Sequence, residues 1–219
     1  MFMAISRTIV AQNIVLATNN LNTSMFGQYW FVNNKIFKPE EFLQDAIYVP
    51  GFTQVSSADC QITIVPNQIQ MAIKEDDQSR ANECVKERFT KMVEAIGALP
   101  IIAIGLNYIW KVVDNEQDNH QLTSYLFADN PTEIYSYFNK SDSMYGAYFS
   151  QNFDMDTRLK LDIKPVHSIV NGQREDYVIA SFNYHRDIRQ GNTMNQLLDQ
   201  LKKWNNLRQN SKKIVCLLK

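Results

Sequence analysis

The fold of this chain is decided by residues 60–96, which read CQITIVPNQIQMAIKEDDQSRANECVKERFTKMVEAI. Apolar and polar residues alternate over residues 60–65 and again over residues 69–74, which is typical of strands with one buried face. A Pro-Asn-Gln run at residues 66–68 lies between them and favours a turn. The first part of this stretch therefore predicts a β-hairpin.

An amphipathic helix is expected immediately after this hairpin. The acidic run at residues 75–77, followed by Ser79, favours a helix start because such side chains cap backbone N–H groups and match the positive end of the helix dipole. Gly97 and Pro100 indicate where the helix ends. Apolar side chains recur at three- and four-residue spacing and predict one buried face: Ala81, Val85, Phe89, Met92, Val93 and Ile96.

A second stretch, residues 158–208, has the same order of elements. Residues 159–164 alternate between apolar and charged side chains, and residues 178–184 again place apolar side chains at every second position. Asn171-Gly172 lies between these runs and favours a chain reversal, because both residues tolerate positive φ. This stretch predicts a second hairpin with a longer turn.

A second amphipathic helix follows that hairpin. Thr193 and Gln196 match the spacing of a capping box, which predicts a helix start. The apolar stripe beyond them consists of Leu197, Leu198, Leu201, Trp204 and Leu207.

Two such units predict the fold class. We expect an α+β fold with a predominantly antiparallel sheet, built from two hairpin-plus-helix repeats with the helices packed on one face. The whole chain, residues 1–219, is expected to form a single domain, with pseudo-repeat halves of about 1–113 and 121–219. The polar run at residues 114–120 is the expected boundary between the halves.

Other segments frame the two units. Residues 5–16 predict a first strand, and residues 37–45 and 131–138 predict short helices. Each half also contains a similar tripeptide, Leu106-Asn107-Tyr108 in the first and Phe182-Asn183-Tyr184 in the second.

The composition excludes several classes of protein. An apolar content of 45% and an aromatic content of 11% exclude wholesale disorder. The longest apolar run, residues 95–106, contains a proline and is too short to cross a membrane. The first residues lack the apolar core of a signal peptide, so Cys60, Cys84 and Cys216 are expected to be reduced. The cytoplasm is therefore the expected compartment.

One motif has the spacing of a protein-kinase catalytic loop. His185-Arg186-Asp187 is followed by Asn192, five residues after the aspartate. No Asp-Phe-Gly sequence follows this motif, and no Gly-rich phosphate loop precedes it. We therefore expect a structural role for these residues and assign no catalytic residue.

Metal and cofactor sites are not predicted from the sequence. His120, His167 and His185 are far apart, and no cysteine lies near a histidine at the spacing of a zinc site. Asp154 and Asp156 resemble the start of a calcium loop, but the glycine and the final glutamate of such a loop are missing. We expect no metal ligand and no cofactor.

Aromatic residues cluster outside the two units. Core packing is one explanation, and an interface is the other, because aromatic side chains are enriched at the centres of interfaces. The residues that we predict to contact a protein partner or a second copy of this chain are Trp30, Phe31, Tyr137, Tyr145 and Tyr148.

The end of the chain is basic. From His185 onward there are eight Lys or Arg and two Asp or Glu residues, whereas the whole chain has a net charge of −1. A solvated helix face is one explanation, and a nucleic-acid-binding surface is the alternative. In that alternative the phosphate contacts would be Lys202, Lys203, Arg208, Lys212 and Lys213.

A family resemblance is carried by residues 104–108, Ile-Gly-Leu-Asn-Tyr, which follow an amphipathic helix. They resemble the Gly-Leu-Arg-Tyr strand signature of a sporadic, uncharacterised bacterial protein family. The order of elements over residues 58–208 is also similar. This chain has Asn107 where that pattern has arginine, and Trp110 where it often has asparagine. The resemblance implies the α+β fold and a bacterial or phage origin, and it implies no activity.

We predict that this chain is a non-enzymatic interaction or assembly protein of bacterial or phage origin, and that it works as a homodimer. The lack of a catalytic motif and the aromatic segments outside the repeated units favour this interpretation. One alternative is a nucleic-acid-binding protein that uses the basic C-terminal region. The other is an enzyme with a site near His185–Asp187. No membrane partner is expected.

Overall fold

The computed structural model describes residues 5–96, 99–113, 123, 133–138, 140, 143–170 and 172–218. Within these residues, nine strands form one antiparallel sheet in the order β2-β3-β4-β5-β1-β6-β9-β8-β7. The strands are β1 (Ser6–Thr18), β2 (Ile47–Val49), β3 (Phe52–Ser56), β4 (Cys60–Val65), β5 (Gln68–Ile73), β6 (Ile101–Val113), β7 (Ala147–Asn152), β8 (Arg158–Val170) and β9 (Gln173–Asp187).

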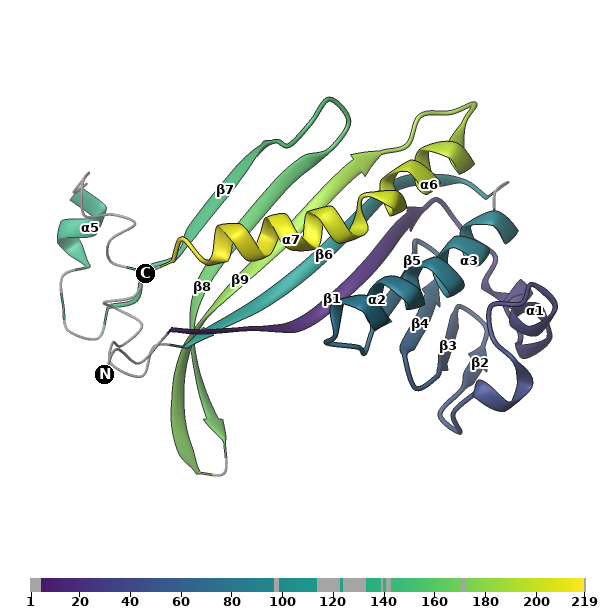
Figure 1. Ribbon diagram of the computed structural model, residues 1–219, viewed down its shortest axis with the longest axis horizontal. Coiled ribbons are helices and arrows are strands. Elements are labelled where there is room, and N and C mark those ends of the chain that lie inside the picture. Colours follow the sequence, from purple (N-terminus) through teal and green to yellow (C-terminus); the bar gives the residue numbers. More distant parts are fainter. Residues whose placement is uncertain are drawn as a thin grey trace.

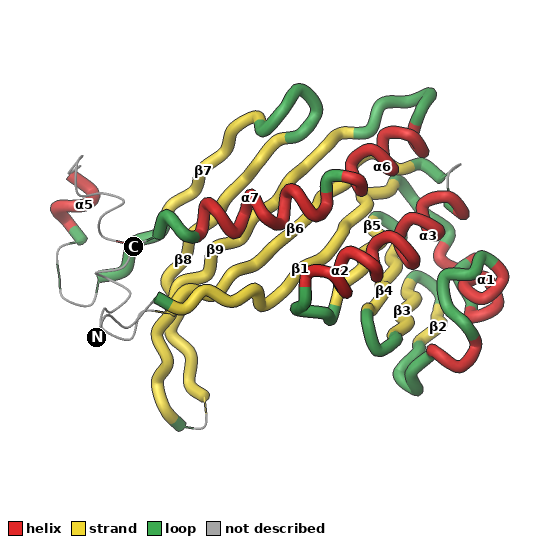
Figure 2. Tube along the Cα trace, in the orientation of Figure 1, coloured by secondary structure: helices red, strands yellow, loops and turns green. Residues whose placement is uncertain are grey.

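The long helical segments lie on one face of this sheet (Figure 1). In the same orientation, Figure 2 shows them in front of the strands, so the fold is α+β with its helices packed on one side. The α-helices are α1 (Gln28–Asn33), α2 (Gln78–Cys84), α3 (Thr90–Ala95), α5 (Glu133–Tyr137), α6 (Thr193–Lys202) and α7 (Trp204–Val215). The shorter turns are η1 (Thr23–Met25) and η2 (Pro39–Glu41), both 3-10 helices, and η3 (Val85–Phe89), which is a π-helix.

The first predicted unit forms as expected. β4 and β5 pair in register from Cys60 opposite Ile73 to Val65 opposite Gln68. Asp77 begins α2, because its carboxylate accepts a hydrogen bond from the Arg80 N–H at 3.0 Å. The helical segment then continues through η3 into α3.

The second predicted unit also forms a hairpin and a helical segment. β8 and β9 reverse next to Gly172, which has a φ of +78°. The following helical segment is interrupted at Lys203, which separates α6 from α7. The expected capping box is wrong: Asn192 precedes α6 without a side-chain cap. The Gln196 side chain instead bonds both backbone groups of Arg189, at 3.0 and 2.8 Å, and so closes the loop after β9.

The predictions for the framing segments have mixed outcomes. The expected strand at residues 5–16 corresponds to β1, and part of residues 131–138 forms α5. Residues 37–45 contain only the 3-10 turn η2 instead of a helix, because the Leu43 N–H donates to the Ser56 carbonyl at 2.9 Å and draws the chain alongside β3. The expected boundary at residues 114–120 lies outside the described residues.

The strand order places the two hairpins on opposite sides of the sheet centre. β1 and β6 pair at that centre, β5 pairs with the outer side of β1, and β9 pairs with the outer side of β6. Figure 1 shows one helical segment over each side. An internal repeat in the strict sense stays a prediction, which a superposition of residues 60–96 on residues 158–208 would test.

The two matching tripeptides lie directly opposite each other. Asn107 of β6 pairs with Asn183 of β9, and the Asn183 side-chain amide donates to the Asn107 side chain at 2.6 Å. Asn107 in turn donates to Asn13 of β1 at 2.7 Å. These side chains form an amide ladder on the face of the sheet opposite α7. A Cβ added at Gly105 would lie 2.9 Å from the Asn183 amide nitrogen, so a larger residue there would displace the Asn183 side chain.

On the other face of β6 and β9, opposite the amide ladder, three aromatic side chains bond to α7 and hold it in place. The Tyr108 hydroxyl donates to the Trp204 carbonyl at 2.7 Å, and the Trp110 indole N–H donates to Ser211 at 3.0 Å. The Tyr184 hydroxyl donates to Asn210 at 2.7 Å. We call Tyr108, Trp110 and Tyr184 the aromatic anchor.

The sequence pattern also predicted the core. Six residues on the predicted apolar faces are all buried: Phe89, Met92, Leu161, Phe182, Leu201 and Trp204. Among the helices that the structure describes, none is long and apolar enough to span a membrane.

Phe89→Ala should lower the free energy of unfolding by about 3–5 kcal/mol, because it removes a fully buried ring and leaves a cavity. Urea unfolding followed by circular dichroism measures this loss. Lys86→Ala, an exposed position on the same helical segment, is the control and should change stability by less than about 0.5 kcal/mol. A loss below about 1 kcal/mol for Phe89→Ala would contradict the assigned core.

Tyr108→Phe should lower the free energy of unfolding by about 1–2 kcal/mol while leaving the ring in place, because it removes the buried hydroxyl that bonds Trp204. The same unfolding measurement applies, with the exposed Tyr29→Phe as the matched control. Equal stability of these two variants would show that the hydrogen bond to α7 contributes nothing.

Candidate functional site

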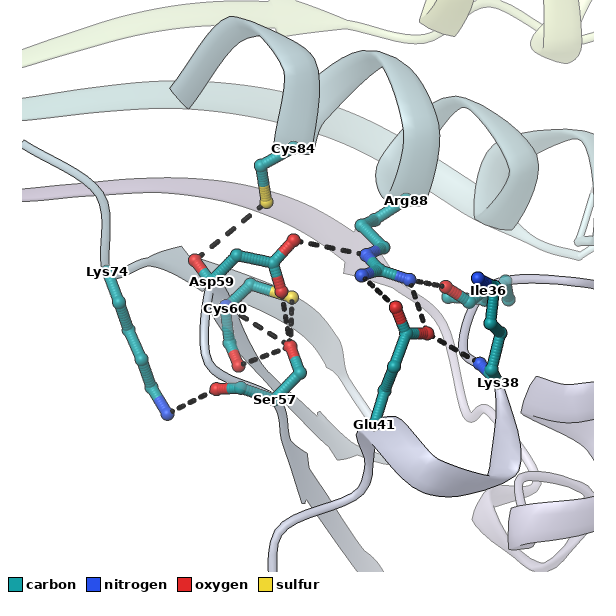
Figure 3. Close-up of polar contacts among 9 residues, drawn as sticks. All are labelled: Ile36, Lys38, Glu41, Ser57, Asp59, Cys60, Lys74, Cys84 and Arg88. Atoms are coloured by element: carbon teal, nitrogen blue, oxygen red, sulfur yellow. Dashed lines mark hydrogen bonds and ion pairs between the residues drawn. The ribbon is translucent and has the colours of Figure 1, made fainter. Parts of the chain in front are cut away.

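A cluster of polar and sulfur-containing side chains lies where the first helical segment faces the turn between β3 and β4 (Figure 3). Ser57, Asp59 and Cys60 come from that turn and from the first residue of β4. Cys84 is the last residue of α2, and Arg88 lies in the π-helical turn η3. π-helical turns occur frequently at functional sites. We call these five residues the cysteine–aspartate cluster.

The β3–β4 turn fixes the orientation of Asp59. The Ser57 hydroxyl donates to one carboxylate oxygen of Asp59, and the Cys60 N–H donates to the same hydroxyl at 3.3 Å. Arg88 Nε donates to the other carboxylate oxygen at 3.2 Å. Burial by itself would raise the pKa of Asp59, but the hydrogen bond from Ser57 and the charge of Arg88 outweigh it and lower that pKa.

The two thiols of the cluster face each other and are buried. Ser57 Oγ lies 3.5 Å from Cys60 Sγ, and Cys84 Sγ lies 3.9 Å from the Asp59 carbonyl oxygen. The hydrogen bond with Cys60, together with burial, raises the pKa of Cys84. Cys84 is therefore a neutral thiol near pH 7.

Arg88 connects the cluster to the segment before β2. Its guanidinium makes a bidentate ion pair with Glu41 at 2.8 and 2.9 Å and donates to the Ile36 carbonyl at 2.8 Å. It also lies over the Phe37 ring, 5.1 Å from the centroid. The hydrogen bond from Arg88 lowers the pKa of Glu41 from its ordinary value of 4.5 to about 2.

Sequence reasoning missed this cluster. Cys60 and Cys84 are separated in the chain and belong to a strand and a helix, so their spacing matches no metal-binding motif. The available signal was weaker: each cysteine occupies the buried face of its own element, and the two elements belong to the same unit. Hairpin-on-helix packing brings such faces together.

The predicted interaction residues fall into two groups. Tyr137 and Tyr148 are exposed, and Trp30 is partly buried. Phe31 and Tyr145 are buried, so their assignment as contact residues is wrong for this structure. The Phe31 ring packs edge-on against the rings of Trp30 and Phe42, and the Tyr145 hydroxyl donates to the Phe138 carbonyl.

Tyr148 belongs to the edge strand β7, next to an apolar groove. The groove has a volume of about 490 Å³ and lies between the outer strands and the end of α7. Its lining includes Phe149, Leu159, Leu161, Ile163, Leu217 and Leu218. Phe149 and Leu217 are also exposed to solvent, so apolar surface extends from the groove to the edge of the sheet.

The predicted phosphate-binding residues do not form one continuous patch. Lys202 pairs with Asp199 at 3.0 Å, and Lys203 pairs with Asp154 at 2.7 Å. Arg208 is buried and donates to the Asp76 carbonyl at 2.6 Å, so its assignment as a phosphate contact is wrong for this structure. Lys212 and Lys213 are exposed on α7.

The kinase-like motif lies at the end of β9. His185 Nε2 is 3.0 Å from the Asp187 carboxylate, whereas Arg186 points to the opposite face and pairs with Asp156 at 3.2 Å. A depression of about 280 Å³ includes His185 and Asp187. Thr157, which also lines it, already bonds Gln200 and Lys203. The hypothesis of an enzyme site here stays a prediction.

Comparisons with known proteins add no assignment. No protein-family model matches the chain, and no curated protein matches its sequence. The resemblance of residues 104–108 to a bacterial family therefore stays a prediction.

Glu41→Gln should destabilise the fold by about 1–2 kcal/mol near pH 7, after allowance for solvent screening of this partly exposed pair. Because the pKa of Glu41 is lower in the folded chain than its ordinary value, the ion pair stabilises the fold above pH 4.5. That contribution should disappear as the pH falls to about 2.

Urea unfolding of the wild type and of Glu41→Gln at a series of pH values measures this difference. The exposed neighbour Glu40→Gln is the control and should leave stability nearly unchanged at neutral pH. A difference between wild type and Glu41→Gln that does not depend on pH would contradict the role of the Arg88–Glu41 ion pair.

Proposed function

We propose that this chain is a non-enzymatic assembly protein that forms a homodimer through the edge strand β7. The observation that carries the proposal is the composition of that strand, Ala147–Asn152, which reads AYFSQN and contains neither a charge nor a proline. An edge strand presents unpaired backbone N–H and C=O groups, and proteins usually protect such edges with charges, proline or bulges. The lack of these protections supports a role in strand pairing.

A second copy of this chain is the partner that the edge favours. Antiparallel pairing of β7 with the same strand of another copy, about a two-fold axis, places identical surfaces against each other and closes the assembly. No like charges meet in this arrangement, because β7 carries none. The opposite edge, β2, has only three residues and is followed by Pro50, so it is poorly suited to such pairing.

The apolar groove supports the same interface. Phe149 is on the edge strand and also lines the groove, so a strand added beside β7 would cover its ring and extend the wall of the groove. Burial of this surface stabilises association in addition to the backbone hydrogen bonds. Tyr148, on the other face of the same strand, would be covered at the same time.

The basic C-terminal region gives less support to nucleic-acid binding. Lys202 and Lys203 already pair with carboxylates, and Arg208 is buried. Specific affinity for nucleic acid requires several cations that meet phosphates together.

Phe149→Lys and Tyr148→Lys should convert the homodimer into a monomer, because each places a charge at the centre of the edge and repels its own copy. Size-exclusion chromatography with light scattering, over a range of protein concentrations, measures the mass in solution. Both variants should keep the circular dichroism spectrum of the wild type, since both positions are exposed in the single chain.

Met155→Lys is the matched control. Met155 is 99% exposed and lies just after β7, so the same change from an apolar to a charged side chain should leave the dimer intact. The proposal would be contradicted by a wild-type chain that stays monomeric at every concentration, or by a folded Phe149→Lys variant that stays dimeric.

A further inference from the structure

The cysteine–aspartate cluster contains three groups that ligate metal ions. Cys60 Sγ, Cys84 Sγ and a carboxylate oxygen of Asp59 all lie within 4.8 Å of one another. Both cysteines are buried and Asp59 is partly exposed, so the group has an inner side and a side toward solvent. We infer that Asp59, Cys60 and Cys84 form a binding site for a thiophilic divalent cation of the zinc class.

The distances between these groups suit such an ion. Zinc binds thiolate sulfur at about 2.3 Å and carboxylate oxygen at about 2.1 Å, and tetrahedral geometry then places neighbouring ligand atoms about 3.6–3.8 Å apart. The ligand atoms of the cluster, which lie within 4.8 Å of one another, therefore need to approach by about 1.2 Å at most. Rotation of the Cys84 side chain at the end of α2 supplies movement of this size.

The charge of the cluster also permits one divalent cation to replace the protons of the two thiols. Arg88 carries one positive charge, and its partners Asp59 and Glu41 carry two negative charges, so these three groups have a net charge of −1. Binding one divalent cation releases the protons of both thiols to solvent, so two positive charges enter and two leave. The net charge of this partly buried region is unchanged, which avoids the cost of placing an unbalanced ion there.

The groups that would surround the ion are already in position. Ser57 and Arg88 each bond one oxygen of Asp59 and hold the carboxylate beside the sulfur atoms (Figure 3). Hydrogen bonds of this outer kind orient metal ligands and contribute to affinity. The nearby Lys74 ammonium donates to the Ser57 carbonyl at 2.9 Å, so its bond is made to the backbone of the turn.

A cation at this position would join two parts of the first unit. Cys84 belongs to α2, whereas Asp59 lies in the β3–β4 turn and Cys60 is the first residue of β4. The three protein ligands leave one tetrahedral position, which water can fill from the exposed side of Asp59. The ion would therefore stabilise the packing of the helix on the hairpin, independently of the edge strand β7.

The test uses the full chain, reduced with a phosphine and freed of metal by a chelator. Cobalt(II) serves as the spectroscopic probe, because thiolate ligation produces sulfur-to-metal charge-transfer absorption and tetrahedral geometry produces strong visible bands. We expect one Co²⁺ per chain, displacement by Zn²⁺, release of about two protons per metal and a Zn²⁺-dependent rise in melting temperature.

Variants assign the ligands. Cys60→Ser and Cys84→Ser should each weaken binding by more than about 100-fold, and Asp59→Asn should weaken it by about 10–100-fold while keeping the charge-transfer bands at saturating Co²⁺. Cys216→Ser is the matched control, because Cys216 is exposed and lies outside the cluster, and it should bind like the wild type. Circular dichroism shows whether each variant folds.

Any of three outcomes would overturn the inference. The first is that the reduced wild type shows no thiolate charge-transfer bands, and the second is that Cys216→Ser, which keeps Cys60 and Cys84, loses them. The third is a Cys60–Cys84 disulfide in place of bound metal when the protein is isolated without a reductant. If a cysteine variant fails to fold, proton release by the wild type and the Asp59→Asn titration still decide between metal binding and its absence.

Discussion

The hydrogen-bonded contact between the centre of the sheet and α7 is the constraint on which the rest of the structure depends. Tyr108 and Tyr184 are large buried side chains with a hydroxyl group, and a buried hydroxyl requires a partner. Both partners lie on α7, at Trp204 and Asn210. The aromatic anchor therefore fixes α7 over β6 and β9 and leaves the outer strands β7 and β8 with an apolar groove beside them.

The cysteine–aspartate cluster and the edge strand β7 lie in different halves of the sheet, and both positions follow from this arrangement. In the first half, the segment around Phe37 packs beside the helix, and Arg88 links it to the cysteine–aspartate cluster. In the second half, the described residues leave β7 as an uncharged edge next to the groove. The sheet face opposite α7 carries the amide ladder of Asn13, Asn107 and Asn183, in which hydrogen bonds between the side chains satisfy much of their capacity to donate and accept.

Much of the fold was predictable, because local periodicity reflects which face of an element is buried. Alternation identified both hairpins, and three- and four-residue spacing identified the helical stripe that contains Phe89. The capping box at Thr193 failed for a different reason: Gln196 bonds the loop after β9, and that loop position depends on where the strand leaves the sheet. Phe31 and Arg208 failed because residue type alone does not distinguish a buried aromatic or cationic side chain from an exposed one.

The sequence by itself determined the two hairpins, the helical segment after each of them, the α+β class and many of the residues that face the core, because each follows from neighbours a few positions apart. Only the tertiary structure decided which distant residues meet. The pairing of β6 with β9 placed Asn107 opposite Asn183, and packing of α2 on the β3–β4 turn placed Cys84 beside Cys60. Those contacts depend on strand order and on the direction of each helix across the sheet, and neither quantity is encoded in the spacing of residues along the chain.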